Sequence, residues 1–556
     1  MNRLYLYISN YLITLRRKFS LVDLYWVLIF SLLLSIPAAY SKEHFAKIVF
    51  LLCFLHSFSW SMLFVFFLQK HYLKMIIYVF IMFLFIIEMF CIFGLGTRFS
   101  AKTLLLVLQT NVDEITTFFS NYIFSHLNII PCIILLVLNV LVLVLAYKLS
   151  QITFKLPKIA YYLFVPLLLL GIMLPYCNIP INNWDNSVLN LVKSSKFIFQ
   201  SGDEISNYKK YLDRIHIISS PDKIKAPTIT LILGESFNKY FSSLYGYSID
   251  TNPQLAKYKE SDNLILYENI LTPTSITNDA MKYVFTHKEC PPIDVQDSCQ
   301  YILMPAVFKQ AAYEVNYLDN QYQIGGGLDF AGDYFMAPED ISEKCFDFRS
   351  DRIYKYDGDF IDAYSSRILR SSKCFNIIHL YGQHSMPRFP QEFDIFKGSD
   401  ILSDSIGEKE KEQIADYLNA VRYNDYVVNK ILELLTDNNA VVIYISDHGE
   451  CVYNGNGVTY GRIQDNCTDL NRRRNVHEIP LMIWCSDKYK ENNMEVFERI
   501  KASRFRVSCL ADIPFLLYEL ACIDFNYNKP SKSIINPYFV PHEIYLNESV
   551  IVPVNP

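Results

Sequence analysis

The stretch Ala440–Glu450, AVVIYISDHGE, is a continuous run of apolar, mostly β-branched residues that ends in an acid, an imidazole and a glycine. Such a run predicts a strand buried on both faces of a parallel sheet. In open α/β sheets, ligands bind beyond the carboxyl ends of the strands. Asp447 and His448 lie there and offer oxygen and nitrogen ligands to a zinc-like cation. The alternative is that they cap a following helix and form a turn.

The composition indicates two different environments along one chain. The 556 residues are 51% hydrophobic, and the mean hydropathy is +0.16 although 19% of the residues are charged. An average of this kind combines a membrane-embedded part with an aqueous part. The formal net charge is −5 and no basic face stands out in the sequence, so we expect no nucleic-acid partner.

The N-terminal part, residues 1–175, is predicted to be a transmembrane domain of five helices. A span needs about 20 apolar residues, and each of five windows reaches or nearly reaches that length. No small-residue cleavage site follows the first window, so it is interpreted as an uncleaved anchor. The windows are residues 22–40, 46–68, 73–95, 127–147 and 159–175.

The basic residues predict the orientation of these spans. Nine Lys and Arg residues flank the spans on the N-terminal side, against four on the opposite side. Because basic residues favour the cytoplasmic side, the N-terminus is expected there and everything after about residue 176 outside.

Two polar features of this half are candidates for function. Glu88 lies within the third window, where a carboxylate is costly and is a functional candidate by default; alternatively it faces the interior of the helix bundle. The loop 99–124 is amphipathic and is expected to lie in the outer interface. Its polar end, with Asn111 and Glu114, either meets a lipid headgroup or is simply solvated.

The rest of the chain predicts an α/β domain. Residues 176–224 are polar and are interpreted as a linker of short helices, and residues 225–556 as one large domain. Apolar strands alternate there with helical segments such as Glu408–Thr436, a pattern typical of a sheet with both faces covered. The strands expected are Thr228–Leu233, Phe375–Leu380, Val441–Ile445 and Ile479–Trp484.

Nine of the thirteen cysteines belong to this outer part, where an oxidising compartment permits disulfides. The favoured pair is Cys290 with Cys299, which flank a short Pro-rich loop. Cys451 with Cys467 is a weaker prediction, because connectivity cannot be deduced from sequence.

Several strand ends carry residues suited to metal-dependent phosphoryl chemistry. Glu235, His384, Asp447 and His448 all follow predicted strands, and carboxylates with imidazoles suit Zn²⁺ or Mn²⁺. The hydroxyl-rich segment Leu271–Ala280 leads into a helix, whose N-terminus favours a phosphate, and a metal lowers the pKa of a hydroxyl. The alternative is an ordinary helix cap.

The order of these features resembles the phosphoethanolamine transferases, inner-membrane enzymes of the alkaline phosphatase/sulfatase superfamily that include those modifying lipid A. The resemblance covers nearly the whole chain and implies a sulfatase-like C-terminal domain. The segments that carry it are the five spans, Gly234-Glu235-Ser236, Leu244-Tyr245-Gly246-Tyr247, Thr251-Asn252-Pro253, a Thr heading a helix, Asp319-Asn320, His-x₄-His, Ser446–Glu450 and Gln109-Thr110-Asn111.

The resemblance also implies roles for individual residues. Thr277 lies eight residues before Phe285, as the nucleophilic Thr of the family lies before its Phe, and is the implied nucleophile. His379 and His384 match a histidine pair that contacts the phosphoryl group or a second metal. The implied ligands of the main zinc are Glu235, Thr277, Asp447 and His448, and the implied substrate-binding residues are Asn111, Glu114, Asn320, His379 and His384.

The chain also departs from the family pattern. A further His, about a dozen residues after the Asp-His pair, is replaced by Tyr460-Gly461, which leaves His477 as the later candidate. Gly325-Gly326-Gly327 stands where the family often has a basic residue, and no Cys pair brackets the nucleophile. The main metal site is therefore better supported than a second one.

The expected function is transfer of phosphoethanolamine from phosphatidylethanolamine to a periplasmic acceptor, namely lipid A, lipopolysaccharide core or another glycan. The implied protein is a zinc enzyme, with Mn²⁺ as the other candidate, and a monomer of the bacterial inner membrane with its catalytic domain in the periplasm. The main alternative is a glycerol-phosphate transferase of the lipoteichoic-acid-synthase type. A sulfatase reaction is disfavoured, because no C/S-x-P-x-R motif surrounds Pro273. A membrane-anchored scaffold that has lost its metal is the non-enzymatic alternative.

Overall fold

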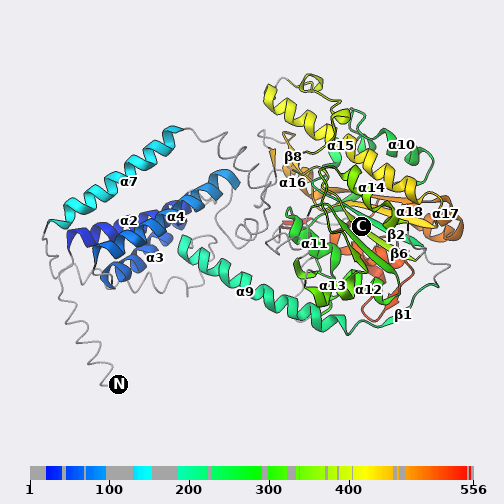
Figure 1. Cartoon of the computed structure of the whole chain (residues 1–556), viewed down its shortest axis with the longest axis horizontal. Helices are drawn as coiled ribbons and strands as arrows, with labels where there is room; N and C mark the ends of the chain where they lie inside the picture. Colours follow the sequence, from blue (N-terminus) through cyan, green and yellow to red (C-terminus); the bar gives the residue numbers. More distant parts are fainter. Residues whose placement is uncertain are drawn as a thin grey trace. The chain divides into compact units, whose positions relative to one another are not determined.

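The computed structural model divides the chain into two compact units, residues 1–201 and 202–556, which are described separately (Figure 1). Asn111, Glu114, the window 159–175, Cys467 and the glycines 325–327 lie outside the described residues. The structure describes residues 20–39, 46–67, 70–95, 129–152, 186–222, 227–290, 298–321, 334–336, 338–369, 373–384, 387–403, 405–454, 460–461, 470–547 and 550–552.

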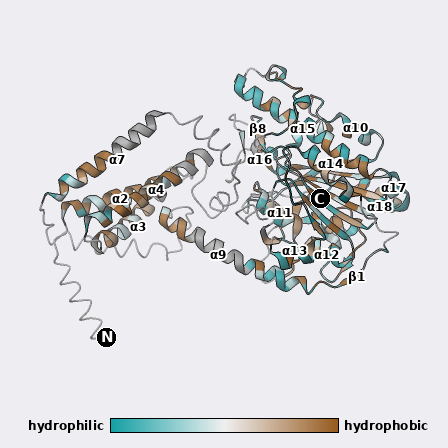
Figure 2. Ribbon diagram, viewed as in Figure 1, coloured by the Kyte–Doolittle hydropathy of each residue, from teal (hydrophilic) through white to brown (hydrophobic). Residues whose placement is uncertain are grey.

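The first unit contains four apolar helices that coincide with the first four predicted windows (Figure 2). Within the described residues, one segment, Tyr72–Met89, is long and apolar enough by itself to cross a membrane. Shorter apolar stretches occupy the other three helices, and the prediction of five spans stays a prediction. The helices are α2 (Leu21–Ala39), α3 (Ala46–Phe67), α4 (His71–Leu95) and α7 (Ile129–Ser150).

Helix α2 is the centre of this unit, because α3, α4 and α7 all pack against it. Trp26 is buried, with its ring 5.4 Å from that of Phe30 and 5.5 Å from that of Tyr78 in α4. Lys74 and Asp23 form an ion pair between α4 and α2. Glu88 is only 1% exposed, so the structure favours an interior position for this carboxylate.

The second unit is built on an eight-stranded sheet in the order β11-β3-β10-β7-β2-β6-β4-β5. The apolar run that begins at Ala440 forms β7, which is buried at every position and parallel to β2, as predicted. Strand β10 is also confirmed, but it runs antiparallel to both neighbours. The strands are β2 (Thr228–Gly234), β3 (Leu264–Leu271), β4 (Glu314–Asp319), β5 (Phe348–Arg349), β6 (Cys374–His379), β7 (Ala440–Ser446), β10 (Glu478–Cys485) and β11 (Val507–Cys509).

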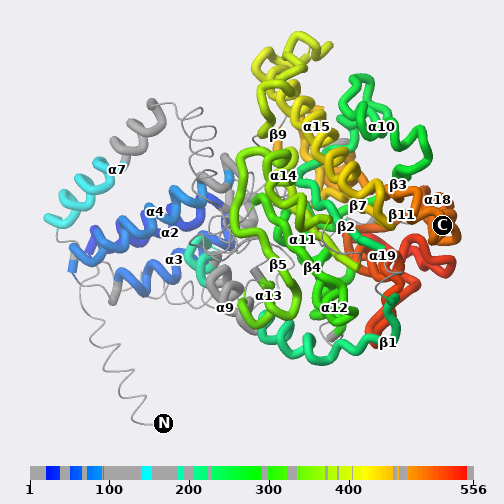
Figure 3. Tube along the Cα trace, turned by 45° about the vertical axis from the view of Figure 1, so that its right-hand side comes forward, coloured from blue at the N-terminus to red at the C-terminus, as the bar shows by residue number. Residues whose placement is uncertain are grey.

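Alternate side chains of the central strands point to opposite faces, which creates two separate cores. In β2, Leu231 and Leu233 join the core beneath α11 (Thr277–Phe285), α12 (Met304–Gln310), α13 (Glu339–Cys345) and α19 (Ile513–Leu520). Ile232 joins the opposite core, beneath α10 (Pro253–Glu260), α14 (Asp357–Ile368) and α15 (Glu408–Leu435). Figures 1 and 3 show these groups of helices on opposite sides of the strands. The expected three-layer α/β architecture is confirmed.

The remaining elements are outside the eight-stranded sheet and the helices named above. Helix α9 (Ser187–Leu212) occupies much of the predicted linker, whose boundaries stay a prediction. The others are α16 (Leu470–His477), α17 (Asp487–Asn492), α18 (Met494–Ser503), the strand pairs β1 (Ile217–Ser219) with β12 (Asp524–Phe525), β8 (Cys451–Val452) with β9 (Tyr460–Gly461) and β13 (Ile544–Leu546) with β14 (Val550–Val552), and the 3₁₀ turns η3 (Lys239–Phe241), η4 (Ser243–Tyr245), η5 (Ser298–Tyr301), η6 (Tyr334–Met336), η7 (Gln391–Phe393), η8 (Gly398–Asp400), η9 (Leu510–Asp512) and η10 (Pro530–Lys532).

The expected disulfide between Cys290 and Cys299 is not formed in the structure. Cys290 is instead turned into the core, where its sulfur accepts a hydrogen bond from the backbone N–H of Tyr545 at 3.2 Å. Cys451 is buried, and its predicted partner Cys467 lies outside the described residues.

We predict that Phe308→Ala destabilises the second unit. The Phe308 ring is fully buried and joins three elements, since it stacks on Phe375 at 4.0 Å and contacts Tyr518 at 6.0 Å. Removing such a ring costs about 3–5 kcal/mol and lowers the melting temperature by about 4–7 °C. Thermal unfolding of the detergent-purified chain checks this, with Phe505→Ala, a ring that is 61% exposed, as the control. Equal melting temperatures for the two variants would contradict the assigned core.

Candidate active site

The carboxyl ends of four neighbouring parallel strands meet at one edge of the sheet. In the register, Gly234 of β2 pairs with Ser446 of β7, and Leu233 pairs with His379 of β6. His379 in turn pairs with Asp319 of β4. Because the strands end at the same level, the residues that follow them are brought together.

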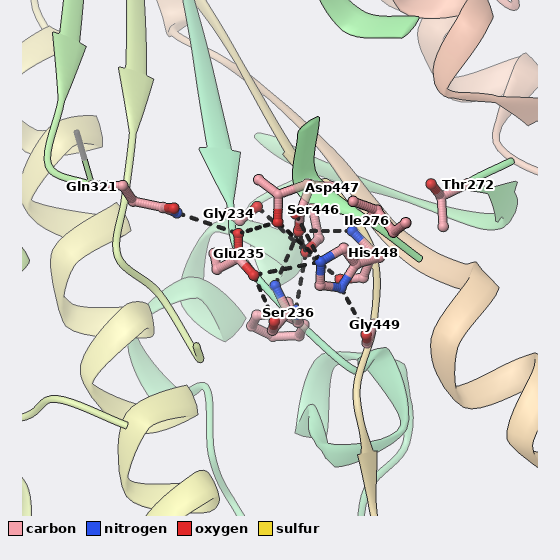
Figure 4. Close-up of polar contacts among 12 residues, drawn as sticks. Gly234, Glu235, Ser236, Thr272, Ile276, Gln321, Ser446, Asp447, His448 and Gly449 are labelled. Carbon is pink, nitrogen blue, oxygen red and sulfur yellow. Dashed lines mark hydrogen bonds and ion pairs between the residues drawn. The ribbon is translucent and has the colours of Figure 1, made fainter. Parts of the chain in front are cut away.

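Three of the predicted ligands form a buried cluster at this edge. One ligand atom each from Glu235, Asp447 and His448 lies within 4.8 Å of the others, and all three side chains are 0% exposed. The Nε2 atom of His448 lies 3.0 Å from Oδ2 of Asp447 and 3.5 Å from Oε1 of Glu235. Figure 4 shows the three side chains directed toward one another beyond the strand ends.

Thr277 completes the predicted set from the other side of the cluster. It is the first residue of α11, and its Oγ1 lies 3.1 Å from Oε2 of Glu235 and 3.3 Å from Nε2 of His448. Its exposed fraction is 8%, against 0% for the three others. Of the four residues, Thr277 is therefore the one that faces the accessible side of the cluster.

The hydrogen bonds of the cluster leave acceptor atoms facing one another. Nδ1 of His448 lies 2.9 Å from the carbonyl oxygen of Gly449, so we place its proton there and a lone pair on Nε2. Oδ1 of Asp447 accepts hydrogen bonds from the backbone N–H groups of Ser236 and His448. Oδ2 accepts none from the residues that the structure describes. Buried lone pairs that face each other are costly unless a cation lies between them, so these residues fit a divalent metal.

The backbone beside Glu235 is strained and tightly held. Ser236 has φ 57°, a left-handed conformation that is uncommon for a residue other than glycine. Its N–H donates to Asp447 Oδ1 at 3.0 Å, its hydroxyl donates to Glu235 Oε1 at 2.7 Å, and its carbonyl accepts from the Tyr417 hydroxyl at 2.7 Å. Strain that the surrounding structure maintains in this way is typical of functional sites.

Two glycines allow the chain to pass close to the ligands. Gly382 has φ +55°, and a Cβ there would lie 2.9 Å from the backbone nitrogen of Glu235. A Cβ on Gly449 would lie 2.1 Å from the carbonyl oxygen of Asn475. Any larger residue at either position would therefore displace a segment that carries a ligand.

The two histidines of the His-x₄-His motif differ in their surroundings. His379 is buried at the end of β6, with Nδ1 3.1 Å from Oδ1 of Asp319. Burial lowers the pKa of His379, but the charge and hydrogen bond of Asp319, together with the charges of Glu235 and Asp447, hold that pKa above its usual value. His384 is less buried and lies in the following loop, with its ring 5.5 Å from that of Tyr381.

Asn320 contributes to the site by shaping a loop. Its Nδ2 donates to Asp357 Oδ1 at 2.8 Å, and its Oδ1 accepts from the Tyr354 N–H at 2.7 Å. Asp357 in turn accepts hydrogen bonds from the backbone N–H groups of Tyr381 and Gly382. The Nδ2 end of the Asn320 amide thus supports, through Asp357, the loop that follows β6, and the Oδ1 end holds the segment before α14.

Gln321 is a contact that sequence reasoning missed. Its Nε2 donates to Glu235 Oε2 at 3.3 Å and to the carbonyl oxygen of Leu380 at 2.8 Å, and Figure 4 shows it directed toward Glu235. Gln321 follows β4, so its side chain reaches past the end of β6, which lies between β4 and β2. Its position directly after Asp319-Asn320, at a strand end, is the signal that could have identified it.

The two candidates for the missing downstream His make contacts with residues outside the ligand cluster. Nδ1 of His477 lies 2.8 Å from the carbonyl oxygen of Thr272, in the loop that precedes Thr277. Burial lowers the pKa of His477 to about 4, so the ring is neutral at physiological pH. Tyr460 lies in β9 with its ring 5.8 Å from that of Tyr453.

The chain matches known proteins over most of its length. The Sulfatase family model matches residues 227–507. The phosphoethanolamine transferase EptC of Escherichia coli strain K12 is 26% identical over 80% of this chain and 79% of its own length. The Kdo(2)-lipid A phosphoethanolamine 7''-transferase of the same strain is 25% identical over 51% of this chain and 49% of its own.

Two solved structures share the fold. The C-terminal periplasmic domain of Escherichia coli EptC, in complex with Zn, has a TM-score of 0.51 at 24% identity and covers 61% of this chain and 94% of its own. The integral membrane protein lipooligosaccharide phosphoethanolamine transferase A (EptA) from Neisseria meningitidis has a TM-score of 0.58 at 14% identity and covers 92% of this chain and 96% of its own.

These matches confirm both the resemblance to the phosphoethanolamine transferases and the predicted sulfatase-like fold of the C-terminal unit. The family model alone spans half of the chain and contains the entire cluster of Glu235, Thr277, Asp447 and His448. The chain belongs to the sulfatase family.

Proposed function

We propose that this protein is a metal-dependent phosphotransferase that moves phosphoethanolamine from phosphatidylethanolamine to an acceptor through an ester on Thr277. The observation that carries the proposal is the position of Thr277 Oγ1, 3.1 Å from Glu235 and 3.3 Å from His448 on the accessible side of a buried ligand cluster. The names of the curated relatives support phosphoethanolamine as the transferred group.

Glu235, Asp447, His448 and Thr277 would hold the metal, which we propose is Zn²⁺, with Mn²⁺ accepted by the same donors. A bound zinc ion supplies Lewis acidity, which stabilises charge on phosphoryl oxygens and lowers the pKa of the Thr277 hydroxyl. The zinc complex of the Escherichia coli EptC domain supports this choice of metal.

The transfer occurs in two balanced steps. First, Thr277 Oγ1 bonds to phosphorus while the bond from phosphorus to the diacylglycerol oxygen breaks, and the hydroxyl proton ends on that leaving oxygen. Glu235 Oε2, 3.1 Å from Oγ1, is within reach to accept the proton on the way. Then an acceptor oxygen bonds to phosphorus, the bond to Oγ1 breaks, and Oγ1 regains a proton.

The surroundings of Thr277 favour a bound phosphate. Its position at the N-terminus of the nine-residue helix α11 directs backbone N–H groups and the positive end of the helix dipole at the phosphoryl group. We assign His379 and His384 to the same group, with the protonated form of His379 stabilised by Asp319. Asn320 is then a positioning residue for the loop that carries His384.

The membrane half would hold the lipid donor beside the catalytic unit. We propose five spans, a monomer in the bacterial inner membrane, and a catalytic unit in the periplasm. Asn111 and Glu114 of the outer loop are assigned to the lipid headgroup. The acceptor class is lipid A, lipopolysaccharide core or another glycan, supported by the relatives that act on Kdo(2)-lipid A and lipooligosaccharide.

The alternatives are less well supported. The main rival, glycerol-phosphate transfer, uses the same nucleophile geometry, but the curated relatives are named phosphoethanolamine transferases. A scaffold without a metal would not be expected to keep three buried ligands directed at one point.

We predict that Thr277→Ala abolishes release of diacylglycerol from phosphatidylethanolamine, with a loss of about 10³-fold or more, because no other group replaces the nucleophile. Thr277→Ser keeps the hydroxyl and should retain measurable activity. The exposed Thr436, at the end of α15, supplies the control variant Thr436→Ala. Lipid products are measured by mass spectrometry.

Undiminished release by Thr277→Ala, with the variant folded, would refute the proposed mechanism. Release of diacylglycerol from phosphatidylglycerol but not from phosphatidylethanolamine would instead favour the glycerol-phosphate rival.

We further predict an alkaline limit to activity that depends on Asp319. If the transfer needs protonated His379, activity falls as pH rises through the pKa of His379, which Asp319 holds above its usual value. Asp319→Asn removes that charge while burial continues to lower the pKa, so the limit moves to lower pH. The exposed Asp262 supplies the control Asp262→Asn. Profiles of kcat/KM against pH that coincide for the three proteins would exclude this role of His379.

A further inference from the structure

The second unit contains another cluster of metal-ligating side chains that the proposed reaction does not use. It consists of Cys509 at the end of β11, Asp512 in η9 and His542 just before β13. One ligand atom from each lies within 4.8 Å of the others. Cys509 and Asp512 are buried, and His542 is partly buried.

The distances within the cluster are close to those of a tetrahedral zinc site. Nε2 of His542 lies 3.0 Å from each carboxylate oxygen of Asp512, and Sγ of Cys509 lies 3.9 Å from Oδ2. Bond lengths of about 2.0–2.3 Å around a tetrahedral zinc place neighbouring ligand atoms about 3.3–3.8 Å apart. Shifts of a few tenths of an ångström would bring the ligand atoms of Cys509, Asp512 and His542 to the separations of a tetrahedral zinc site.

A fourth ligand is available from a distant part of the chain. Cys290 follows α11, and the nearby Cys509 thiol and the charge of His542 lower the pKa of its own thiol. Its sulfur is outside the group of three ligand atoms that lie within 4.8 Å of one another, so it would turn toward them when the metal binds. The N–H of Tyr545 holds its sulfur at 3.2 Å. Two thiols, an imidazole and a carboxylate are a donor set that zinc prefers.

Neighbouring groups already orient these ligands. Nδ1 of His542 lies 3.1 Å from the carbonyl oxygen of Glu543, a contact that favours a proton on Nδ1 and a lone pair on Nε2. The hydroxyl of Ser508 donates to Oδ2 of Asp512 at 2.7 Å. Hydrogen bonds of this kind fix the tautomer and direction of metal ligands.

We propose that Cys290, Cys509, Asp512 and His542 form a structural zinc site, separate from the catalytic cluster. Four protein ligands would close the coordination shell, as in structural rather than catalytic zinc sites. The two competing arrangements are a Cys290–Cys509 disulfide, which an oxidising compartment favours, and a metal-free ion pair between His542 and Asp512.

The site would hold the segment that carries Thr277. Cys290 lies beyond the C-terminal end of α11, and η9, with Asp512, packs against that helix. On the other side of Thr277, Pro273 accepts a hydrogen bond of 2.7 Å from the N–H of Asn547, which follows β13. The zinc would thus join the C-terminal segment to both ends of the nucleophile helix.

X-ray absorption at the zinc edge distinguishes the two metal sites, because the catalytic cluster contains no sulfur ligand. The full chain is purified in detergent without reductant or chelator, and zinc is counted by elemental analysis. We expect two zinc ions per chain and a sulfur shell at about 2.3 Å. Asp447→Asn should leave one zinc ion, and its shell should be richer in sulfur.

Variants of the second cluster give the complementary result. We expect one zinc ion per chain in Cys509→Ser and also in His542→Ala, a variant that keeps both thiols. Cys509→Ser should in addition remove the sulfur shell from the absorption spectrum. The exposed Cys522 supplies the control, and Cys522→Ser should keep two ions. A Cys290–Cys509 disulfide in peptide maps, or zinc bound only by nitrogen and oxygen while both thiols are free, would overturn the proposal.

Discussion

The shared register of β4, β6, β2 and β7 is the constraint on which the rest of the site depends. It brings Glu235, Asp447 and His448 into one fully buried cluster. In this cluster, Nε2 of His448 lies 3.0 Å from Oδ2 of Asp447 and 3.5 Å from Oε1 of Glu235. Two buried carboxylates this close together repel each other, and a cation between them and His448 would offset that repulsion. The shared register therefore accounts for a site that fits a metal.

The elements around this edge serve to hold it and to supply the reacting group. Gly382 and Gly449 permit the close passage of the backbone, and Asn320 with Asp357 fixes the loop after β6. Helix α11 then places Thr277 beside Glu235 and His448, and Thr277 is the most exposed of the four residues.

Much of this could be predicted from the sequence, because local patterns carried it. The run in β7 predicts a buried strand, and the ligands follow strands directly, so their meeting point could be expected. Thr277 depended on resemblance, since nothing local distinguishes it from an ordinary helix-capping hydroxyl. Gln321 could have been identified from its position after Asp319-Asn320 at a strand end, whereas Asp357 could not be foreseen, because its role comes from hydrogen bonds to the distant loop after β6. The prediction of a Cys290–Cys299 disulfide was wrong. It was based on proximity in sequence, whereas in the folded chain the Cys509 thiol is a neighbour of Cys290.

The central claim is that Thr277 carries the phosphoethanolamine group between donor and acceptor. The most direct measurement is intact-mass and peptide mass spectrometry of the purified chain after incubation with phosphatidylethanolamine in the absence of acceptor. The account predicts a single phosphoethanolamine adduct located on Thr277 and absent from Thr277→Ala. An adduct on a different residue, or continued transfer to an acceptor with no covalent species on Thr277 at any time, would contradict it.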